Sequence, residues 1–549
     1  MLDKVILIGA KLSGIYKIGG NMSQIGMRLK NEYLPATMGA VTIGIIVGII
    51  VALFNICLNF LSNTAVTIYT YVQENWYMVP IFLAGLIILA VSMAYIHKKR
   101  PQVRGGGMPQ TIALSKGEVK FKWYQVLWSN IVCSFMSFFA GLPVGAEGPS
   151  MFVGASSANG VWKTCKYRPF MRKYLITAGA SSGLAATFNA PLAGILFAIE
   201  KIHRKFSPLL LYIVGIAVIF STIVFHLLDI LLGSSIEPFF NFSFLSVFPF
   251  EYFWVLIILG LAIGVSAVIF QLILTKTQSF TDKHTKGFPY WIRLICAFVF
   301  TGVIGLFFID AITGGRGLIE KVSSADFSLQ LIGILLLIKL FLITVCYNSG
   351  ATGGLFIPSL CIGALVGGLC GHLFMICGLP SEYYTSIVCF SMLGFLTGMT
   401  HAPMSSLVLL IEMTGFTGNL LSCGIVIVAA YTIALVLRPK SLYEEQVDRL
   451  VKNTGYNESE PAKTKHIEVT EKSVLINKRV SDIFLPQSVA ISSITRNDKK
   501  IVSDSETRFR VGDKVQFIYQ GACKEKVGMY LKDIAGKPKT EEIWDFEGQ

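Results

Sequence analysis

The chain has 549 residues, a length that could hold several soluble domains. Its composition excludes that reading, since 53% of the residues are hydrophobic and 15% charged, whereas soluble domains hold about 25% charged residues. The net charge of +14 does not indicate a nucleic-acid-binding surface, because basic and acidic residues balance at 18 each from Glu444 onward. The excess, 29 basic against 15 acidic, lies in the apolar part up to Tyr443, as membrane topology produces. The sequence therefore predicts an all-α polytopic protein of the lipid bilayer with a soluble tail.

Along the chain we expect a cytoplasmic segment at 1–30, a membrane domain at 31–445, a linker at 446–465 and a folded tail at 466–549. A bilayer-crossing helix needs about 20 apolar residues. Stretches of that kind lie at 36–62, 78–96, 122–142, 208–233, 249–275, 290–309, 328–346 and 418–437. Shorter or Gly/Pro-interrupted pieces lie at 105–117, 149–163, 173–203, 356–378 and 384–414, and they predict broken or tilted helices.

Loop charges predict the orientation of the membrane domain. The connection 63–77 holds no Lys or Arg, whereas 97–104 holds four. Positive residues favour the cytoplasmic side. We therefore expect the N-terminus, the 97–104 loop and the tail to be cytoplasmic.

An internal repeat relates two halves of the membrane domain, about 31–233 and 249–443. Residues 189–200 match 401–412, each with Ala-Pro at positions two and three and Glu at twelve, and 149–155 match 358–364. The two motifs are separated by 42 residues in the first half, from Pro149 to Pro191, and by 45 in the second, from Pro358 to Pro403. Membrane transporters are often built from such repeats, with substrate sites on broken helices at the repeat interface. We infer that the repeats are inverted.

Three motifs in which glycines precede a proline predict helices that begin inside the membrane. They are Gly105-Gly-Gly-Met-Pro109, Gly145-Ala-Glu-Gly-Pro149 and Gly353-Gly-Leu-Phe-Ile-Pro358. Proline suits the first helical turn, and glycines permit close backbone approach. The first N–H groups of a helix need acceptors and attract negative charge. One such motif could be a packing kink, but three of them predict an anion site.

Glu147 is the acidic residue most strongly indicated as functional, because it lies within one of these helix starts. Its carboxylate can occupy the anion site and leave it when protonated, so one group would serve as gate and proton acceptor. Glu200 and Glu412 end the matched repeats, where we expect them to stabilise buried or interfacial structure.

These motifs resemble those of the CLC family of chloride channels and anion/proton antiporters, over roughly residues 30–445. Gly145–Pro149 is similar to its G-[KR]-E-G-P motif, which implies that Glu147 is the external gating glutamate. Gly353–Pro358 is similar to G-x-F-x-P, which implies anion contacts from the amides of Leu355 and Phe356. Tyr443 falls where the family places its central-site tyrosine. The resemblance implies a homodimer with one chloride pathway in each subunit, built from inverted halves.

Some positions depart from the family pattern. Gly105–Pro109 resembles G-S-G-I-P, but Gly106 replaces the serine, so only the backbone amides of Gly106 and Gly107 remain as anion donors. This leaves chloride or nitrate preference open, while the retained Pro149 disfavours fluoride. Ala146 replaces the usual basic residue, which weakens the positive potential near the external entrance.

Lys201 stands where many exchangers of this family carry a second, internal proton-transfer glutamate. A lysine cannot copy a carboxylate relay, although one with a lowered pKa can carry protons. The simpler interpretation is a lysine whose ammonium reaches the cytoplasmic boundary. Channel and exchanger therefore both remain open.

The tail beyond the linker shows short alternating strands and resembles the TrkA-C (RCK C-terminal) regulatory module over about 466–535, rather than paired CBS domains. Such α/β modules bind small ligands such as cyclic dinucleotides, and a tail that only aids assembly is the alternative. The implied setting is a bacterial cytoplasmic membrane.

Together these observations predict voltage- or pH-dependent chloride transport, as Cl⁻/H⁺ exchange with Glu147 as gate and proton acceptor. The alternatives are a passive chloride channel, or a membrane receptor that senses a ligand and signals through the tail. The sequence holds no nucleophile–base set, and its eleven cysteines show no metal-ligand spacing. We therefore expect no enzyme, metal site or organic cofactor in the membrane domain, only bound chloride.

Overall fold

The computed structural model describes residues 33–453 and 462–520 together with 531 and 534. Outside the described residues lie 118, 120, 204–205, 233–238, 241, 243–244, 285–288, 416, 439, 472, 474, 481–484, 486–488, 502–503 and 505–506 within those ranges. The expected cytoplasmic segment 1–30 and part of the expected linker also lie outside them.

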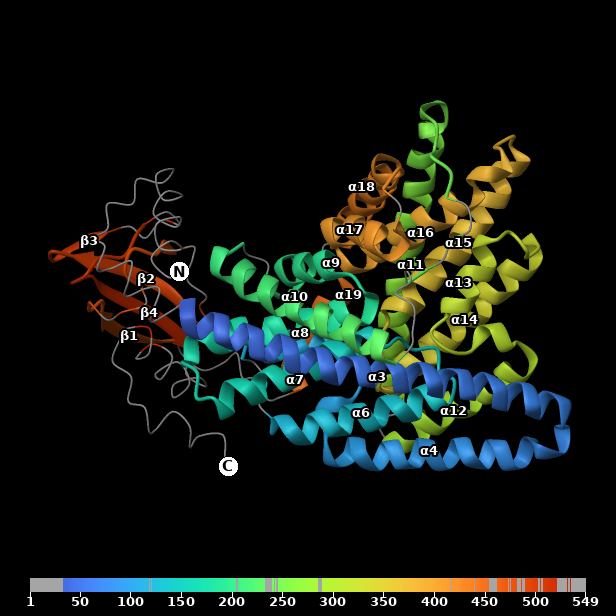
Figure 1. The fold of residues 1–549 in the computed structure, drawn as a ribbon, viewed down its shortest axis with the longest axis horizontal. Helices are drawn as coiled ribbons and strands as arrows, with labels where there is room; N and C mark the ends of the chain where they lie inside the picture. Colours follow the sequence, from blue (N-terminus) through green and yellow to red (C-terminus); the bar gives the residue numbers. More distant parts are fainter. Residues whose placement is uncertain are drawn as a thin grey trace.

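Helices form almost all of the described membrane domain (Figure 1). The first half contains α3 (Leu34–Glu74), α4 (Val79–Lys99), α5 (Met108–Ser115), α6 (Trp123–Phe139), α7 (Glu147–Thr164), α8 (Arg172–Phe188), α9 (Pro191–Phe197) and α10 (Pro208–Leu231). The second contains α11 (Phe253–His284), α12 (Tyr290–Phe307), α13 (Arg316–Ser323), α14 (Leu329–Ser349), α15 (Phe356–Ile376), α16 (Tyr384–Thr400), α17 (Pro403–Thr414), α18 (Leu420–Leu437) and α19 (Leu442–Asn453).

Within the described residues, eight helices are long and apolar enough to cross a membrane. Two expectations need correction. The stretch 122–142 forms α6, a helix of only 17 residues, whereas 356–378, expected to be broken, forms the 21-residue α15. The glycines of α15 do not interrupt the helix. They allow its backbone to pack closely against α16, since a Cβ added at Gly367 would lie 2.4 Å from the Ser391 Cβ.

The two halves are joined by a reciprocal contact between the repeated helices α9 and α17. Glu412, near the end of α17, accepts hydrogen bonds from the backbone N–H groups of Leu192 and Ala193 at the start of α9. Glu200, just after α9, accepts hydrogen bonds from Met404 and Ser405 at the start of α17. Because each repeat caps the helix start of the other, the two helices run antiparallel. This confirms the inverted relation predicted from the sequence.

Large apolar side chains cover much of the outside of the helical domain. Leu231 is 79% exposed, Leu337 69% and Leu421 68%. Exposed apolar surface on this scale is unfavourable in water. It fits the hydrocarbon of a bilayer, so the surface agrees with the prediction of a multi-pass membrane protein.

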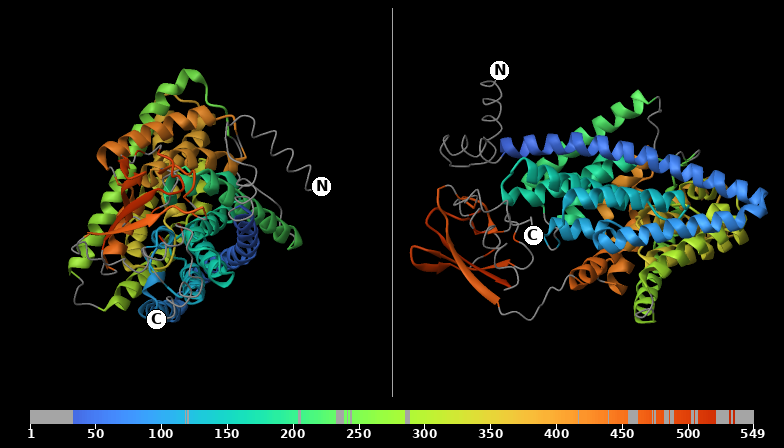
Figure 2. Two further views of the ribbon diagram at one scale, coloured as in Figure 1. Left: turned by 90° about the vertical axis from the view of Figure 1, so that its left-hand side faces the viewer. Right: turned by 90° about the horizontal axis from the view of Figure 1, so that it is seen from below.

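The tail contains an antiparallel sheet at one end of the helical domain (Figure 2). Its strands are β1 (Ala462–Glu468), β2 (Val489–Arg496), β3 (Lys499–Ile501) and β4 (Lys514–Gln520), in the order β1-β4-β2-β3. Val515 and Phe517 of β4 are fully buried. The buried Asp513 accepts hydrogen bonds from two guanidinium nitrogens of Arg496, at 2.7 and 2.8 Å. This contact raises the pKa of the Arg496 guanidinium and fixes the end of β2 beside β4.

Candidate anion-binding site

Three glycine-rich loops meet near the middle of the helical domain. Gly145 and Gly354 exchange two backbone hydrogen bonds, of 2.8 and 2.7 Å. The Gly105 N–H donates to the Gly350 carbonyl at 3.1 Å, and the Gly353 N–H donates to the Gly105 carbonyl at 3.3 Å. The loops that precede α5, α7 and α15 are therefore held together by their own backbones. Glycine is needed because the chains approach so closely.

Gly106 and Gly148 show how little space remains between the loops. A Cβ at Gly148 would lie 1.8 Å from the Gly106 carbonyl oxygen. At Gly107, where φ is +76°, a Cβ would lie 2.4 Å from the Gly148 carbonyl oxygen. Neither position accepts a larger residue without moving the backbone. As a result, α5 and α7 begin almost in contact, with their positive ends converging.

Glu147 begins α7, and its side chain lies inside this junction. The residue is fully buried. Its carboxylate is packed beside two glycines. A Cβ added at Gly145 would lie 2.2 Å from Glu147 Oε2, and a Cβ added at Gly354 would lie 2.9 Å from the same oxygen. The N–H groups of Glu147 itself and Ile357 interact with the carboxylate, yet neither oxygen completes a hydrogen bond of normal geometry. The carboxylate is therefore surrounded by polar backbone groups that do not complete its hydrogen bonds.

Tyr443 approaches the junction from a fourth helix start. It lies in the first turn of α19, which packs against α5. The residue is 3% exposed, and among the described residues its hydroxyl has no hydrogen-bond partner. The hydroxyl lies within electrostatic range of Glu147. A buried hydroxyl normally finds a partner. This one is available as a donor to a bound group.

The structure thus brings together six residues that the sequence singled out: Gly106, Gly107, Glu147, Leu355, Phe356 and Tyr443. Leu355 directly precedes α15, and Phe356 is its first residue. Near the end of α8, the Phe188 ring lies 4.9 Å from the Phe356 ring, centroid to centroid. The helix starts of α5, α7, α15 and α19 therefore surround one small region, which is the candidate anion site.

Lys201 has a different environment from the one expected of a lysine at the cytoplasmic boundary. It is 5% exposed, and its Nζ lies 3.5 Å from Ser441 Oγ and 3.8 Å from Glu444 Oε1. Its charge is therefore buried against polar partners at the start of α19 rather than exposed at the protein surface. Sequence reasoning missed Ser441 and Glu444, although a serine three residues before a glutamate is the signature of a capping box.

A buried histidine, which the sequence analysis did not single out, supports the glycine loops. His97 is fully buried in α4, with Nδ1 3.0 Å from the Tyr290 hydroxyl and Nε2 2.9 Å from the Thr352 hydroxyl. Thr352 in turn donates to the Val103 carbonyl at 2.8 Å. These contacts join the loop before α5 to the loop before α15.

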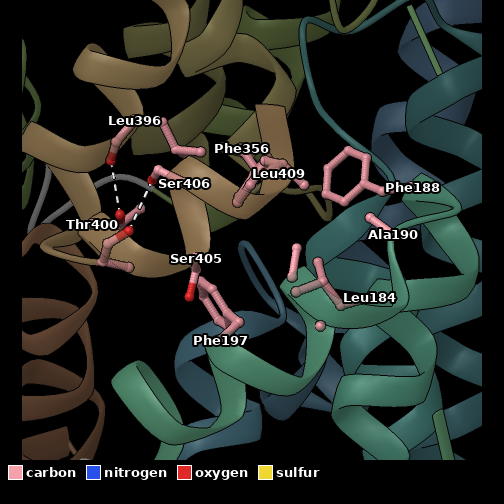
Figure 3. Close-up of a pocket in the computed structure, with 13 residues that line it drawn as sticks. Leu184, Phe188, Ala190, Phe197, Phe356, Leu396, Thr400, Ser405, Ser406 and Leu409 are labelled. Atoms are coloured by element: carbon pink, nitrogen blue, oxygen red, sulfur yellow. Dashed lines mark hydrogen bonds between the residues drawn. The ribbon is translucent and has the colours of Figure 1, made fainter. Parts of the chain in front are cut away.

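A narrow crevice beside Phe356 separates α8 and α9 from α15, α16 and α17 (Figure 3). Its walls include Phe188, Phe197 and Leu409. The hydroxyls of Thr400 and Ser406 donate to carbonyls of their own helical segment. The Ser405 hydroxyl donates to Glu200, so the three hydroxyl groups in the lining are already hydrogen-bonded. Among the described residues, no group of three metal-ligating side chains is found.

Comparisons with known proteins identify the family to which the chain belongs. The sequence model of the family described as voltage gated chloride channel matches residues 88–435, more than half of the chain, and the TrkA-C domain model matches 466–522. An H⁺/Cl⁻ exchange transporter, ClcA, of Klebsiella pneumoniae (strain 342) is 28% identical over 433 residues, or 76% of this chain and 89% of the relative. ClcA of Salmonella arizonae is 26% identical over 78% of this chain and 92% of its own length.

Among solved structures, a slow cyanobacterial Cl⁻/H⁺ antiporter aligns with a TM-score of 0.70 at 23% identity, covering 76% of this chain and 99% of the other. A eukaryotic CLC transporter aligns with a TM-score of 0.65 at 19% identity, and the alignment covers 81% of this chain and 78% of the other. At these identities the structural likeness concerns the fold.

Proposed function

The chain belongs to the CLC family of voltage gated chloride channels, and on this premise we propose that it exchanges chloride for protons across a membrane. Glu147 serves as both gate and proton acceptor. The observation that carries this proposal is the Glu147 carboxylate, which is fully buried at the junction of the helix starts and completes no hydrogen bond of normal geometry with the described residues.

The chemistry of this position explains why one group can do both tasks. Helix N-termini bind anions through N–H groups and the positive end of the helix dipole. An ionised carboxylate competes with chloride for that environment. When a proton binds, the side chain becomes neutral and loses its attraction to the helix starts, so chloride can replace it. Loss of the proton returns the carboxylate and displaces the anion.

The other residues contribute donors. The amides of Gly106, Gly107, Leu355 and Phe356 and the Tyr443 hydroxyl would hold chloride as uncharged hydrogen-bond donors. None of these donors carries a full positive charge, so they bind chloride less tightly than a lysine or arginine side chain would. Transport requires such moderate binding.

The names of the relatives favour exchange over passive conduction, since they are H⁺/Cl⁻ exchange transporters. We further propose a homodimer in a bacterial cytoplasmic membrane with both termini in the cytoplasm. The TrkA-C domain at 466–522 would regulate transport by binding a small ligand such as a cyclic dinucleotide.

Purified protein in liposomes tests the proposal. An outward chloride gradient should drive proton uptake, and chloride flux should rise as the pH falls because protonation displaces Glu147. Chloride flux without proton movement would instead identify a passive channel. If neither ion moves, transport itself is excluded and the receptor alternative gains support.

A further inference from the structure

The buried charge of Lys201 has no part in the proposed exchange cycle. Its ammonium lies 3.5 Å from Ser441 Oγ and 3.8 Å from Glu444 Oε1. A lysine is seldom buried unless it is paired. The pair joins a π-helical segment of the first half, Ala198–His203, to the start of α19.

Ser441 and Glu444 shape the helix turn that carries Tyr443. The Ser441 hydroxyl donates to Glu444 Oε1 at 2.7 Å, and the Ser441 carbonyl accepts the N–H groups of Glu444 and Glu445 at 3.1 and 3.2 Å. Tyr443 stands between the two capping residues. A shift of either residue would therefore move the backbone that carries the Tyr443 side chain.

The same π-helical segment holds two elements of the second half. Glu200 caps α17, and the adjacent Lys201 contacts the α19 start. The first half is therefore anchored to the tyrosine-bearing helix directly beside a contact that joins the two repeats. This gives a mechanical reason for a lysine at position 201.

We propose that the Lys201–Glu444 ion pair is a positioning element that directs the Tyr443 hydroxyl at the anion site. The inference rests on the proposed function, since it assigns Lys201 an effect on chloride affinity through Tyr443. Lys201 does not touch the anion in this account, and it does not carry the proton.

Two other ion pairs lie at α19, and the exposed one provides a matched control. Glu445 pairs with Arg438, and Asp448 pairs with Lys440 at 2.7 Å. The Lys440–Asp448 pair is exposed, with side chains 61% and 49% accessible. Exposed pairs contribute little, so Lys440→Met should leave chloride binding unchanged.

A double-mutant cycle on the full-length protein tests the proposal. Chloride affinity is measured by calorimetry in detergent for wild type, Lys201→Met, Tyr443→Phe and the double variant. Lys201→Met should weaken binding about 3- to 10-fold, the size of one ordinary hydrogen bond. In the Tyr443→Phe background it should have no further effect, because the hydroxyl it directs is gone.

Charge reversal adds a readout that a general loss of stability would not produce. Lys201→Glu alone should impair binding most, because it sets two carboxylates against each other, and adding Glu444→Lys should restore affinity. If Lys201→Met does not fold, Glu444→Gln replaces it in the cycle, since the amide still accepts from Ser441.

Additive effects with Tyr443→Phe, or unchanged affinity in Lys201→Met, would overturn the inference while leaving the proposed function intact. A wild-type protein that neither binds nor transports chloride would overturn both.

Discussion

Replacing Glu200 by alanine removes the acceptor that the second half of the protein depends on at the start of α17. The carboxylate accepts the N–H groups of Met404 at 3.0 Å and Ser405 at 2.8 Å, as well as the Ser405 hydroxyl. Helix-cap losses cost about 0.5–2 kcal/mol and hydrogen bonds to charged groups about 1.5–3 kcal/mol. We expect Glu200→Ala to lower the free energy of unfolding by about 2–4 kcal/mol.

Glu412→Ala provides the symmetric experiment. Glu412 accepts two N–H groups, from Leu192 at 2.8 Å and Ala193 at 2.7 Å, and it accepts no hydroxyl within the part of the chain that the structure describes. Its loss should therefore cost less, about 1–3 kcal/mol. Thermal unfolding of the purified protein in detergent measures both variants, and Glu200→Ala should lower the Tm further than Glu412→Ala.

Glu320→Ala serves as the control, because Glu320 forms an exposed pair with Arg316 one helical turn away. Such a pair contributes about 0–1 kcal/mol. If Glu200→Ala and Glu412→Ala lower the Tm no more than Glu320→Ala, the reciprocal caps do not stabilise the two halves and the reasoning fails.

Three further predictions concern the site and the tail. Gly148→Ala would set a Cβ 1.8 Å from the Gly106 carbonyl oxygen, so we expect no monodisperse protein on size-exclusion chromatography; a folded, transporting variant would refute the close packing. Asp513→Ala leaves Arg496 without its buried partner and should destabilise the tail by about 3 kcal/mol, seen as faster release of the tail by trypsin; an unchanged rate would contradict this. Tyr443→Phe should raise the chloride Kd about 3- to 10-fold in calorimetry, and an unchanged Kd would remove the hydroxyl from the site.

Much of the site could be predicted from the sequence because its chemistry is carried by the backbone. Glycines before a proline indicate an abrupt helix start, and the repeated motifs indicate that two such starts are related. The structure brings Gly106, Glu147 and Phe356 together as that reasoning requires. The family resemblance added Tyr443, whose isolated position in the sequence indicates nothing by itself.

Contacts between distant segments could not be predicted in the same way. Glu200 and Glu412 were expected to stabilise structure, but only the fold shows that each caps the other's repeat. The sequence left the role of Lys201 open, and only the fold shows its ion pair with Glu444, 243 positions later in the chain. The length of α15 was misjudged because glycine was taken to interrupt a helix, whereas in α15 it permits close packing with α16.

Proton uptake driven by a chloride gradient, compared in the same liposome preparation for wild type and Glu147→Gln, tests the central claim most directly. Glutamine keeps the size of the side chain but cannot take up and release a proton. The account predicts proton uptake in the wild type and none in the variant, with chloride flux retained and independent of pH. Proton uptake in Glu147→Gln equal to that of the wild type would contradict the role of Glu147 as gate and proton acceptor.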